Sequence, residues 1–435
     1  MSFETISVIG LGYIGLPTAA IFASRKLKVL GVDVNENAVN TINQGKIHII
    51  EPELDAIVFK AVQQGYLQAS TQAKPADAFL IAVPTPFKAS DDACATPEPD
   101  LHFIEQAAQT IAPVLAKGNL VILESTSPVG ATEQLAHWLK ELRPDLSFPQ
   151  DVADDADINV AHCPERVLPG KVVKELVHND RVIGGMTQTC SERSVELYKI
   201  FVDGDCIITN SRTAEMAKLT ENASRDVSIA FANELSMICD DLDINVWELI
   251  SLANRHPRVN ILQPGPGVGG HCIAVDPWFI VSKTPGKAKI IQQARQINDS
   301  KPAWVLAQYK QKLDELLSEA PNKIAEDITV ACLGIAFKAD IDDLRESPAL
   351  SIALELNQLH QGKMLVVEPN IEQLPNEFDE GVTLSKLNDA MIEADIVLLL
   401  VDHKPFIRFD IKKINVPKLI DTRGIWTPKQ VFNDK

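Results

Sequence analysis

The sequence predicts an α/β protein in which two doubly wound domains are joined by a central helical domain with a long helix. Short apolar runs alternate with helix-length segments through the first two hundred residues, which indicates βαβ units and a mostly parallel sheet. From 212 to about 241 the chain has neither Gly nor Pro, as expected of a long helix. Strand patterns return after a polar segment at 318–327. We therefore expect domains at 1–210, 211–320 and 321–435.

The individual elements follow from the same patterns. In the first domain we expect a polar, Pro-containing surface loop at 88–99 and strands at 6–10, 28–33, 79–83, 120–123, 159–162, 181–183 and 206–209. The middle domain combines the long helix with a Pro- and Gly-rich loop at 257–277 and a second helical region at 287–317, bent near Pro302. In the third domain we expect a helix at 347–359 and strands at 328–333, 364–367, 396–401 and 418–420.

Composition limits the classes of function. The 435 residues are 46% hydrophobic and 23% charged, a balance typical of a globular protein with two or three domains. The formal net charge of −18 argues against a nucleic-acid partner, which would need clustered Lys and Arg. We find no secretory signal at the start and no apolar run near the roughly 20 residues that span a membrane. The 7 cysteines form no C-x-x-C pair, so we expect reduced thiols in a cytoplasmic protein, without a metal site.

A glycine motif lies where the first predicted strand meets the first predicted helix. Gly10 would allow the tight turn, Gly12 the close approach of a pyrophosphate, and Gly15 close packing of helix against strand. The N–H groups at the start of the helix would then face the phosphates. This context predicts a Rossmann-like dinucleotide site.

Three further side chains are candidates for this site. Asp33 lies 18 residues after Gly15, about where a carboxylate meets the adenosine ribose. It would repel the 2′-phosphate of NADP, so NAD is favoured, although Asp33 could instead cap the next helix. Thr85 and Thr126 each follow a predicted strand and so lie at the carboxyl edge of the sheet, where the crevice is. Ordinary turn chemistry explains the two threonines equally well.

The segment from Gly265 to Asp276 carries the strongest chemical signal. Glycine occupies four of the six positions at 265–270, which suits a backbone that wraps closely around a ligand. Cys272 follows, and Asp276 lies four residues later. If a helix starts near Cys272, the two side chains share a face and the helix N–H groups activate the thiol. The pattern favours a nucleophile that forms a thiohemiacetal and then a thioester, although a buried thiol is the alternative.

A row of polar residues follows one face of the predicted long helix. Lys218, Asn222 and Arg225 are spaced at i, i+4 and i+7, so they point the same way. Such a row is usually a solvated face. A Lys and an Asn that face a cleft could instead stabilise the oxyanion that develops during hydride transfer, with Lys218 also acting as acid or base.

Several segments, in the same order, match one protein family. They are the G-x-G-x-x-G motif at 10–15, Ser125-Thr126, the Cys-Pro-Glu-Arg run at 163–166, the helical run at 214–222, the Gly-rich loop with Cys272 and Asp276, and the runs at 334–338 and 345–348. On these motifs the chain resembles the UDP-glucose/GDP-mannose dehydrogenase family over essentially its full length.

The resemblance implies an enzyme that oxidises the C6 alcohol of a nucleotide sugar to the carboxylate with two NAD and one water. It implies that Cys272 is the nucleophile, that Lys218 donates and accepts protons beside Asn222, and that Asp276 and Thr126 position water. The residues implied to contact NAD are Gly10, Gly12, Tyr13, Ile14, Gly15, Asp33, Thr85, Thr126 and Arg345. Those implied to hold the UDP-sugar are Arg166, Val167, Lys218, Asn222, Arg225, His256, Arg258, Gly269, Phe337, Lys338 and Arg423.

The resemblance also implies an NAD-binding first domain, a central domain that forms a homodimer and a nucleotide-sugar-binding third domain. The segments 164–170, 253–260 and 275–279 are most similar to the members that oxidise UDP-N-acetylmannosamine. One departure matters. Where the UDP-glucose enzymes carry a second acid, Pro169 stands here, which leaves Glu165 as the only carboxylate of that pair and its role in hydrolysis open.

Alternatives stay open at this stage. The sugar could be UDP-N-acetylglucosamine or UDP-glucose, because discrimination depends on the shape of the pocket. A two-electron dehydrogenase would use Lys218 and Asn222 without covalent catalysis, and a sensor or scaffold would bind NAD without turnover. Arg258, Lys338 and Arg423 could bind a pyrophosphate or form surface salt bridges. His256 could bind phosphate or cap the helix that ends near 254.

Overall fold

The computed structural model describes residues 3–49, 51–89, 96–168, 170–270, 272–411 and 418–426. Contacts group the chain into two compact units, which are unit 1 (Met1–Glu221 and Trp278–Pro285) and unit 2 (Asn222–Pro277 and Gly286–Lys435). The three-domain division with its boundaries stays a prediction. Within the described residues, no helix combines the length and the apolar character needed to cross a membrane.

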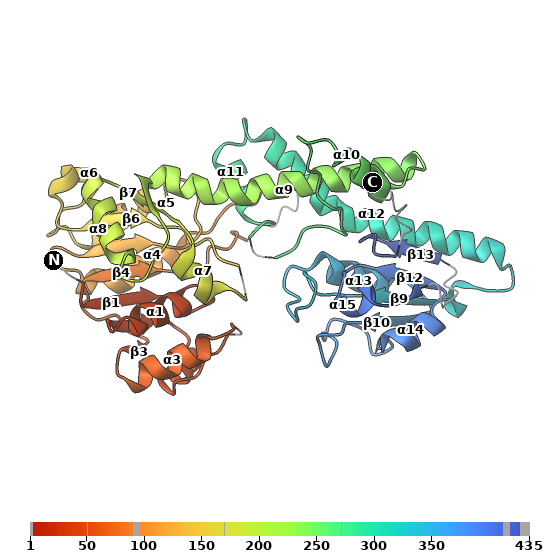
Figure 1. Ribbon diagram of the computed structural model, residues 1–435, viewed down its shortest axis with the longest axis horizontal. Helices are drawn as coiled ribbons and strands as arrows, with labels where there is room; N and C mark the ends of the chain where they lie inside the picture. The colour runs from red at the N-terminus through yellow and green to blue at the C-terminus, as the bar shows by residue number, and fades with distance from the viewer. Residues whose placement is uncertain are drawn as a thin grey trace. The chain divides into compact units, whose positions relative to one another are not determined.

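Unit 1 contains an eight-stranded sheet in the order β3-β2-β1-β4-β5-β6-β7-β8 (Figure 1). Its strands are β1 (Thr5–Ile9), β2 (Lys28–Val32), β3 (Leu67–Ser70), β4 (Ala78–Ile81), β5 (Leu120–Leu123), β6 (Asn159–His162), β7 (Arg181–Gly185) and β8 (Cys206–Asn210). All neighbours pair in parallel except β6 and β7, which are antiparallel. The predicted mostly parallel sheet is thus confirmed. The edge strand β3 was not predicted, because only two of its four side chains are fully buried.

Helices cover both faces of this sheet and enclose two cores. The helices that contribute to the first core are α1 (Gly15–Ser24), α2 (Glu36–Asn43), α3 (Leu54–Gln63), α7 (Val172–His178) and α8 (Gln188–Tyr198). Those that contribute to the second are α4 (His102–Ile111) and α5 (Ala131–Leu142), and the short α6 (Pro149–Val152) follows α5. This is the doubly wound arrangement, with the strands nearly continuous in apolar residues because both faces are covered.

Two helices of 31 residues each dominate the middle of the chain. Helix α9 (Ser211–Asp241) matches the predicted long helix, and α12 (Lys289–Glu319) continues without a break through Pro302. Between them lie α10 (Val246–Ala253) and α11 (Asp276–Lys283). The side chain of Asn245 caps α10 by accepting the N–H groups of Trp247 and Glu248.

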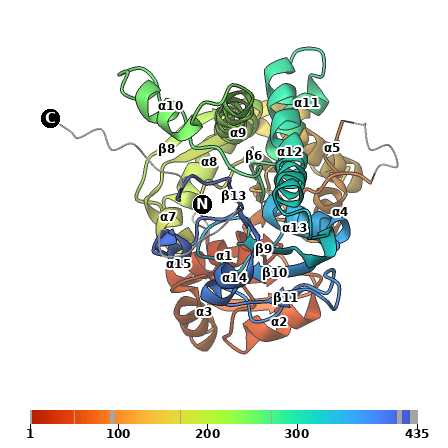
Figure 2. The ribbon, with the colours of Figure 1, turned by 90° about the vertical axis from the view of Figure 1, so that its right-hand side faces the viewer.

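Unit 2 contains a five-stranded sheet, parallel throughout, in the order β11-β10-β9-β12-β13 (Figures 1 and 2). Its strands are β9 (Thr329–Leu333), β10 (Lys363–Val367), β11 (Thr383–Leu384), β12 (Ile396–Leu399) and β13 (Lys418–Asp421). Helices α12 and α13 (Pro348–Leu359) pack into one core, and α14 (Leu387–Glu393) and α15 (Lys404–Ile407) into the other. The second, smaller doubly wound domain is thereby confirmed.

Candidate active site

The glycine motif after β1 forms a cradle in which Gly10 and Gly15 leave no room for a side chain. A Cβ atom on Gly10, whose φ is +89°, would lie 2.6 Å from the carbonyl oxygen of Ala82. A Cβ atom on Gly15 would lie 1.8 Å from the carbonyl oxygen of Gly10, because α1 begins there against the turn. Gly12 has no atom within 4 Å of such a Cβ and faces open space. The backbone can therefore be approached closely at Gly12, as a pyrophosphate requires.

Asp33 turns its carboxylate toward this cradle. One oxygen accepts the N–H of Leu11 at 2.8 Å and the other accepts the N–H of Asn35 at 2.9 Å. The cap of α2 is Asn35 itself, which accepts the N–H groups of Asn37 and Ala38, so the cap alternative for Asp33 is wrong. Thr85 follows β4, and its hydroxyl is buried without a hydrogen bond among the described residues. These groups fit a dinucleotide, with Tyr13 exposed and Ile14 at the start of α1.

A buried glutamate joins the loop after β5 to the first turns of α9. Glu215 accepts the N–H of Gly130 at 2.7 Å and both the N–H and the hydroxyl of Thr132, at 2.8 and 2.6 Å. Burial raises the pKa of Glu215, and these bonds oppose the rise. Since Lys218 lies one turn beyond Glu215, the loop that carries Thr126 is held at a set distance from the helix that presents Lys218. The side chains of Thr126 and Lys218 are both partly exposed.

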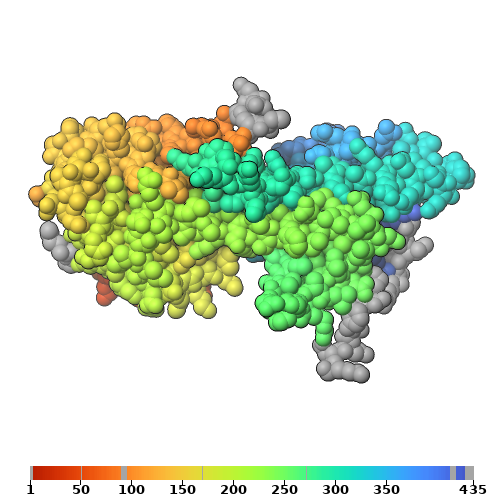
Figure 3. Space-filling view, turned by 90° about the horizontal axis from the view of Figure 1, so that it is seen from above, coloured from red at the N-terminus to blue at the C-terminus, as the bar shows by residue number. Residues whose placement is uncertain are grey.

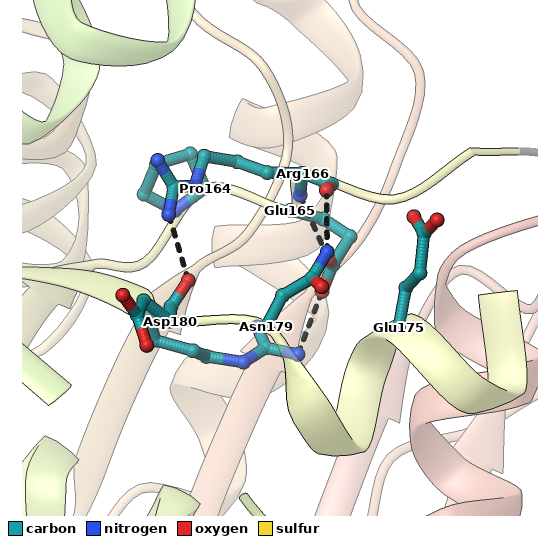
Figure 4. Close-up of a pocket in the computed structure, with 7 residues that line it drawn as sticks. Pro164, Glu165, Arg166, Glu175, Asn179 and Asp180 are labelled. Atoms are coloured by element: carbon teal, nitrogen blue, oxygen red, sulfur yellow. Dashed lines mark hydrogen bonds and ion pairs between the residues drawn. The ribbon is translucent and has the colours of Figure 1, made fainter. Parts of the chain in front are cut away.

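The loop after β6 contains Glu165 and Arg166 beside a small hollow (Figure 4). Glu165 is buried, with one oxygen 2.7 Å from Nη2 of Arg181 and the other accepting the N–H of Arg166 at 2.7 Å. The guanidinium of Arg166 donates to Glu221 and to the carbonyl of Asp180, both at 2.7 Å. Arg166 is thereby joined to α9, and Val167 packs against the first core. Pro169 lies outside the described residues.

In unit 2, Asn222 and Asp276 form a buried pair. Nδ2 of Asn222 donates to Oδ2 of Asp276 at 2.6 Å, with 8% and 3% of the two residues exposed. Cys272 is exposed, and its carbonyl accepts the N–H of Asp276 at 2.9 Å. Helix α11 begins at Asp276 and residues 272–275 form turns, so the condition of a helix that starts near Cys272 is not met. Activation of this thiol by helix N–H groups therefore has no support.

The glycine loop lies closely against the loop after β9. A Cβ atom on Gly269 would lie 2.3 Å from the carbonyl oxygen of Glu346, and one on Gly270 would lie 3.2 Å from the ring of Phe337. A Cβ atom on Gly265 would lie 2.7 Å from Nη1 of Arg423. Phe337 and Arg423, both predicted to hold the nucleotide sugar, thus lie against the loop that contains Gly269. Arg423 also forms an ion pair with Asp402 at 2.9 Å.

The remaining predicted residues lie on the surface of unit 2. Arg225 on α9 and Lys338 are exposed, and Arg345 pairs with Asp343 at 2.6 Å. His256 and Arg258 lie in an exposed loop after α10, where Nδ1 of His256 accepts the N–H of Arg258 at 3.3 Å. His271 lies outside the described residues.

Two buried polar clusters escaped the sequence analysis. The arginine cluster consists of Glu124, Glu165, Arg181 and Tyr198 in unit 1. The helix-pair network consists of Asp226 and Asn233 on α9 with Arg295 and Asn298 on α12. The sequence holds a weak signal for the helix-pair network. Asp226 and Asn233 are spaced at i, i+7, and Arg295 and Asn298 at i, i+3, each pair on an otherwise buried helix face. The arginine cluster has no local signal, because its members come from four separate elements.

Comparison with known proteins agrees with this geometry. Residues 4–202, 212–300 and 331–428 match the NAD binding, central and UDP binding domains of the UDP-glucose/GDP-mannose dehydrogenase family. The chain is 63% identical to the UDP-N-acetyl-D-mannosamine dehydrogenase of Yersinia pestis over 98% of this chain and 100% of the relative. It is 60% identical to the NDP-N-acetyl-D-galactosaminuronic acid dehydrogenase of Ralstonia nicotianae, over 99% and 98%. The solved UDP-D-ManNAc dehydrogenase of Pyrococcus horikoshii is similar with a TM-score of 0.83 and 38% identity, over 98% and 97%.

The matches to the three domain models follow the chain in order, and the glycine cradle with Asp33 lies in the part that matches the NAD binding domain. NAD is accordingly the cofactor of this oxidoreductase. The chain therefore belongs to the UDP-glucose/GDP-mannose dehydrogenase family and is an NAD-dependent nucleotide-sugar dehydrogenase.

Proposed function

We propose that this enzyme oxidises C6 of UDP-N-acetylmannosamine to the uronate through a covalent intermediate on Cys272. The observation that carries the proposal is the exposed thiol of Cys272, one turn before the buried pair of Asn222 and Asp276. The substrate is supported by the 63% identity to the relative from Yersinia pestis and by the segments 164–170, 253–260 and 275–279. The relative from Ralstonia nicotianae, at 60%, makes another N-acetylated sugar the main rival, ahead of UDP-N-acetylglucosamine and UDP-glucose.

The first half of the reaction produces an aldehyde. When bound, NAD supplies the acceptor for one hydride in each of two oxidations. Lys218 takes the proton of the C6 hydroxyl, and Asn222 donates a hydrogen bond to the oxygen as negative charge develops on it. The Asn222 amide is oriented for this because its Nδ2 is already bonded to Asp276 at 2.6 Å.

In the second half the sulfur of Cys272 adds to the aldehyde carbon and the carbonyl oxygen takes a proton, which gives a thiohemiacetal. Loss of a hydride and a proton leaves a thioester, and water cleaves its C–S bond to release the carboxylate and the thiol. Asp276, Thr126 and Glu165 position the water or accept its proton. In total, one alcohol, two NAD⁺ and one water are converted to one carboxylate, two NADH and three protons.

We further propose that residues 1–210 bind NAD, that 211–320 form a homodimer contact and that 321–435 bind the nucleotide sugar. The segment 231–252 of unit 2, which runs from the end of α9 into α10 and is green in Figure 3, exposes apolar side chains that a second copy would cover. They are Phe231, Ile238, Leu242, Ile244 and Leu252. We place the enzyme in the cytoplasm, where NAD and nucleotide sugars are available.

Cys272→Ser tests the covalent step. We expect acid formation to fall by at least three orders of magnitude while binding of the UDP-sugar changes little, because serine lacks a thiolate at neutral pH. Cys206→Ser is the matched control, since Cys206 is half-buried in β8 and should keep full activity. Undiminished turnover of Cys272→Ser would refute the nucleophile.

Two further measurements address the rival functions. The wild-type enzyme should release two NADH per sugar; a ratio of one would support the two-electron dehydrogenase and remove the thioester. A panel of UDP- and GDP-sugars should show the highest kcat/KM for UDP-N-acetylmannosamine. A higher value for another UDP-sugar would correct the substrate, and binding of NAD without turnover of any sugar would support a sensor.

A further inference from the structure

Two carboxylates share one guanidinium in the interior of unit 1. Nη2 of Arg181 lies 2.7 Å from Oε2 of Glu165, and Nη1 lies 3.9 Å from Oε1 of Glu124. All three side chains expose 8% of their surface or less. One positive charge cannot neutralise two carboxylates, so the arginine cluster holds either an excess negative charge or a proton.

The guanidinium pairs closely with Glu165 and only loosely with Glu124. Among the described residues, Nη1 of Arg181 and Oε2 of Glu124 are buried without a hydrogen bond. Tyr198 on α8 donates its hydroxyl to Oε1 of Glu124 at 2.6 Å, and its ring lies 4.6 Å from Cζ of Arg181. A shift of about 1 Å along the ring would bring Nη1 into hydrogen-bonding distance of Glu124.

Glu124 is the group in this cluster that exchanges a proton near neutral pH. Burial raises its pKa to about 7, with Arg181 opposing the rise and Glu165 adding to it. The other titratable groups that face it are Tyr198 and the thiol of Cys163 at the end of β6, and burial raises the pKa of both, so they stay neutral. Cys206 on β8, whose pKa is also raised, interacts with Cys163.

Glu165 connects this interior cluster to a hollow. Together with Pro164, Arg166 and Asp180 it lines the hollow shown in Figure 4. Arg181, the first residue of β7, lines the same hollow. Oε1 of Glu165 is held by the N–H of Arg166, so Oε2, the oxygen paired with Arg181, is the one available for a change of partner. Whatever moves Arg181 therefore changes the capacity of Glu165 to accept a proton.

We propose that Arg181 is a positioning residue that pairs alternately with Glu165 and Glu124, so that ionisation of Glu124 releases Glu165 to accept a proton from water. The inference rests on the proposed function, in which Glu165 assists hydrolysis of the thioester. While Glu124 holds a proton, Arg181 pairs with Glu165, and an ion-paired carboxylate is a poor proton acceptor. Once Glu124 is ionised, it attracts the guanidinium, and Glu165 is released.

Glu124→Gln tests the exchange, because glutamine keeps an acceptor for the Tyr198 hydroxyl and cannot ionise. The measurement is the single-turnover rate of acid formation between pH 6 and pH 8. Because the ionised fraction of a group with a pKa near 7 rises about tenfold over this interval, the ratio of the wild-type rate to the variant rate should rise about tenfold. Glu141→Gln, at an exposed position on α5, is the control and should keep a constant ratio. The KM values for NAD and for the sugar should not change.

Tyr198→Phe provides a second variant with a different expected result. Loss of the hydroxyl removes a bond that lowers the pKa of Glu124, so the rise in rate should move to higher pH rather than disappear. Independently of activity, infrared difference spectra between pH 6 and pH 8 should show loss of a protonated carboxyl band, and Glu124→Gln should lack that band.

The outcomes separate this inference from the proposed function. A pH-independent ratio for Glu124→Gln, with two NADH still released per sugar by the wild-type enzyme, would overturn the exchange alone. Absence of the infrared band would also overturn it. Release of one NADH per sugar would remove the thioester and the exchange together. A loss of activity in Glu124→Gln that is equal at every pH would mean that Glu124 only supports the fold.

Discussion

Replacement of Lys301 by Met should make the stability of unit 2 less dependent on pH. Lys301 lies on α12 with 2% of its surface exposed, and its ammonium donates to the hydroxyl of Ser236 at 2.5 Å. Burial lowers its pKa from 10.5 to about 7, with Asp240 opposing the shift. The folded state therefore resists holding the proton that the unfolded chain binds easily.

The direction and the size of the change in stability with pH follow from the difference in the pKa of Lys301 between the folded and the unfolded chain. Between pH 7 and about pH 10.5 the unfolded chain binds more protons than the folded protein, so the free energy of unfolding rises with pH across that window. A difference of about 3.5 pKa units corresponds to about 5 kcal/mol. The ring of Trp304, 3.5 Å from Nζ of Lys301, favours the charged form by roughly 1–2 kcal/mol. We therefore expect a change of about 3 to 5 kcal/mol over the full window.

Urea unfolding at fixed protein concentration, followed by tryptophan fluorescence at several pH values, measures this effect. The wild-type free energy of unfolding minus that of Lys301→Met should rise with pH from 7 to 10, because groups that titrate in both proteins cancel. Lys310→Met, at an exposed position on the same helix, should show a constant difference from wild type. A constant difference for Lys301→Met as well would refute the assignment of a costly buried charge.

Two other substitutions test the cofactor site and the helix pair. Asp33→Asn should lower the preference for NAD over NADP by about ten- to a hundredfold in kcat/KM, because the charge that repels a 2′-phosphate is lost; an unchanged preference would mean that Asp33 only anchors Leu11. Arg295→Met should lower the free energy of unfolding of unit 2 by about 3 to 5 kcal/mol, because it leaves the carboxylate of Asp226 buried without its cation. The double variant with Asp226→Asn should recover part of that loss, and equal losses in the single and double variants would contradict this explanation.

The local pattern of apolar and polar residues was sufficient to predict most of the strands and the long helices. The runs at 120–123 and 159–162 coincide with β5 and β6 because buried parallel strands are continuously apolar. The short edge strands β3 and β11 were missed, since Leu-Gln-Ala-Ser and Thr-Leu are too short and too polar to stand out. The short helix α11 was not predicted, since most of it lies between the predicted loop at 257–277 and the predicted helical region at 287–317.

The candidate site was predictable where a motif specifies the backbone and not where distant side chains meet. Gly10, Gly15 and Asp33 lie as the dinucleotide motif requires, because a short turn determines the two glycines and the parallel pairing of β1 with β2 brings Asp33 beside that turn. Arg181 could not be found, since as the first residue of a predicted strand it has no local pattern that reveals two acids around it. Its partners Glu124 and Glu165 are 57 and 16 residues away along the chain.

The helix-pair network connects residues that are distant in the sequence to the glycine loop. The loop at 265–270 contains four glycines, so it has few side chains that packing could hold in place. Its first glycine donates its N–H to Asn233 at 2.8 Å, and Asn233 donates in turn to Asn298 at 2.9 Å.

Asn298 donates to Asp226 at 2.8 Å, and Arg295 neutralises that carboxylate at 2.6 Å. The network therefore runs from a buried ion pair between α9 and α12 to the backbone of the glycine loop. A buried charge pair contributes little net stability, but it specifies one arrangement of the two helices. A loop with so few side chains cannot be fixed by them, so its conformation depends on polar groups of α9 and α12. Cys272 lies two residues after that loop, so we expect its position to depend on the same network.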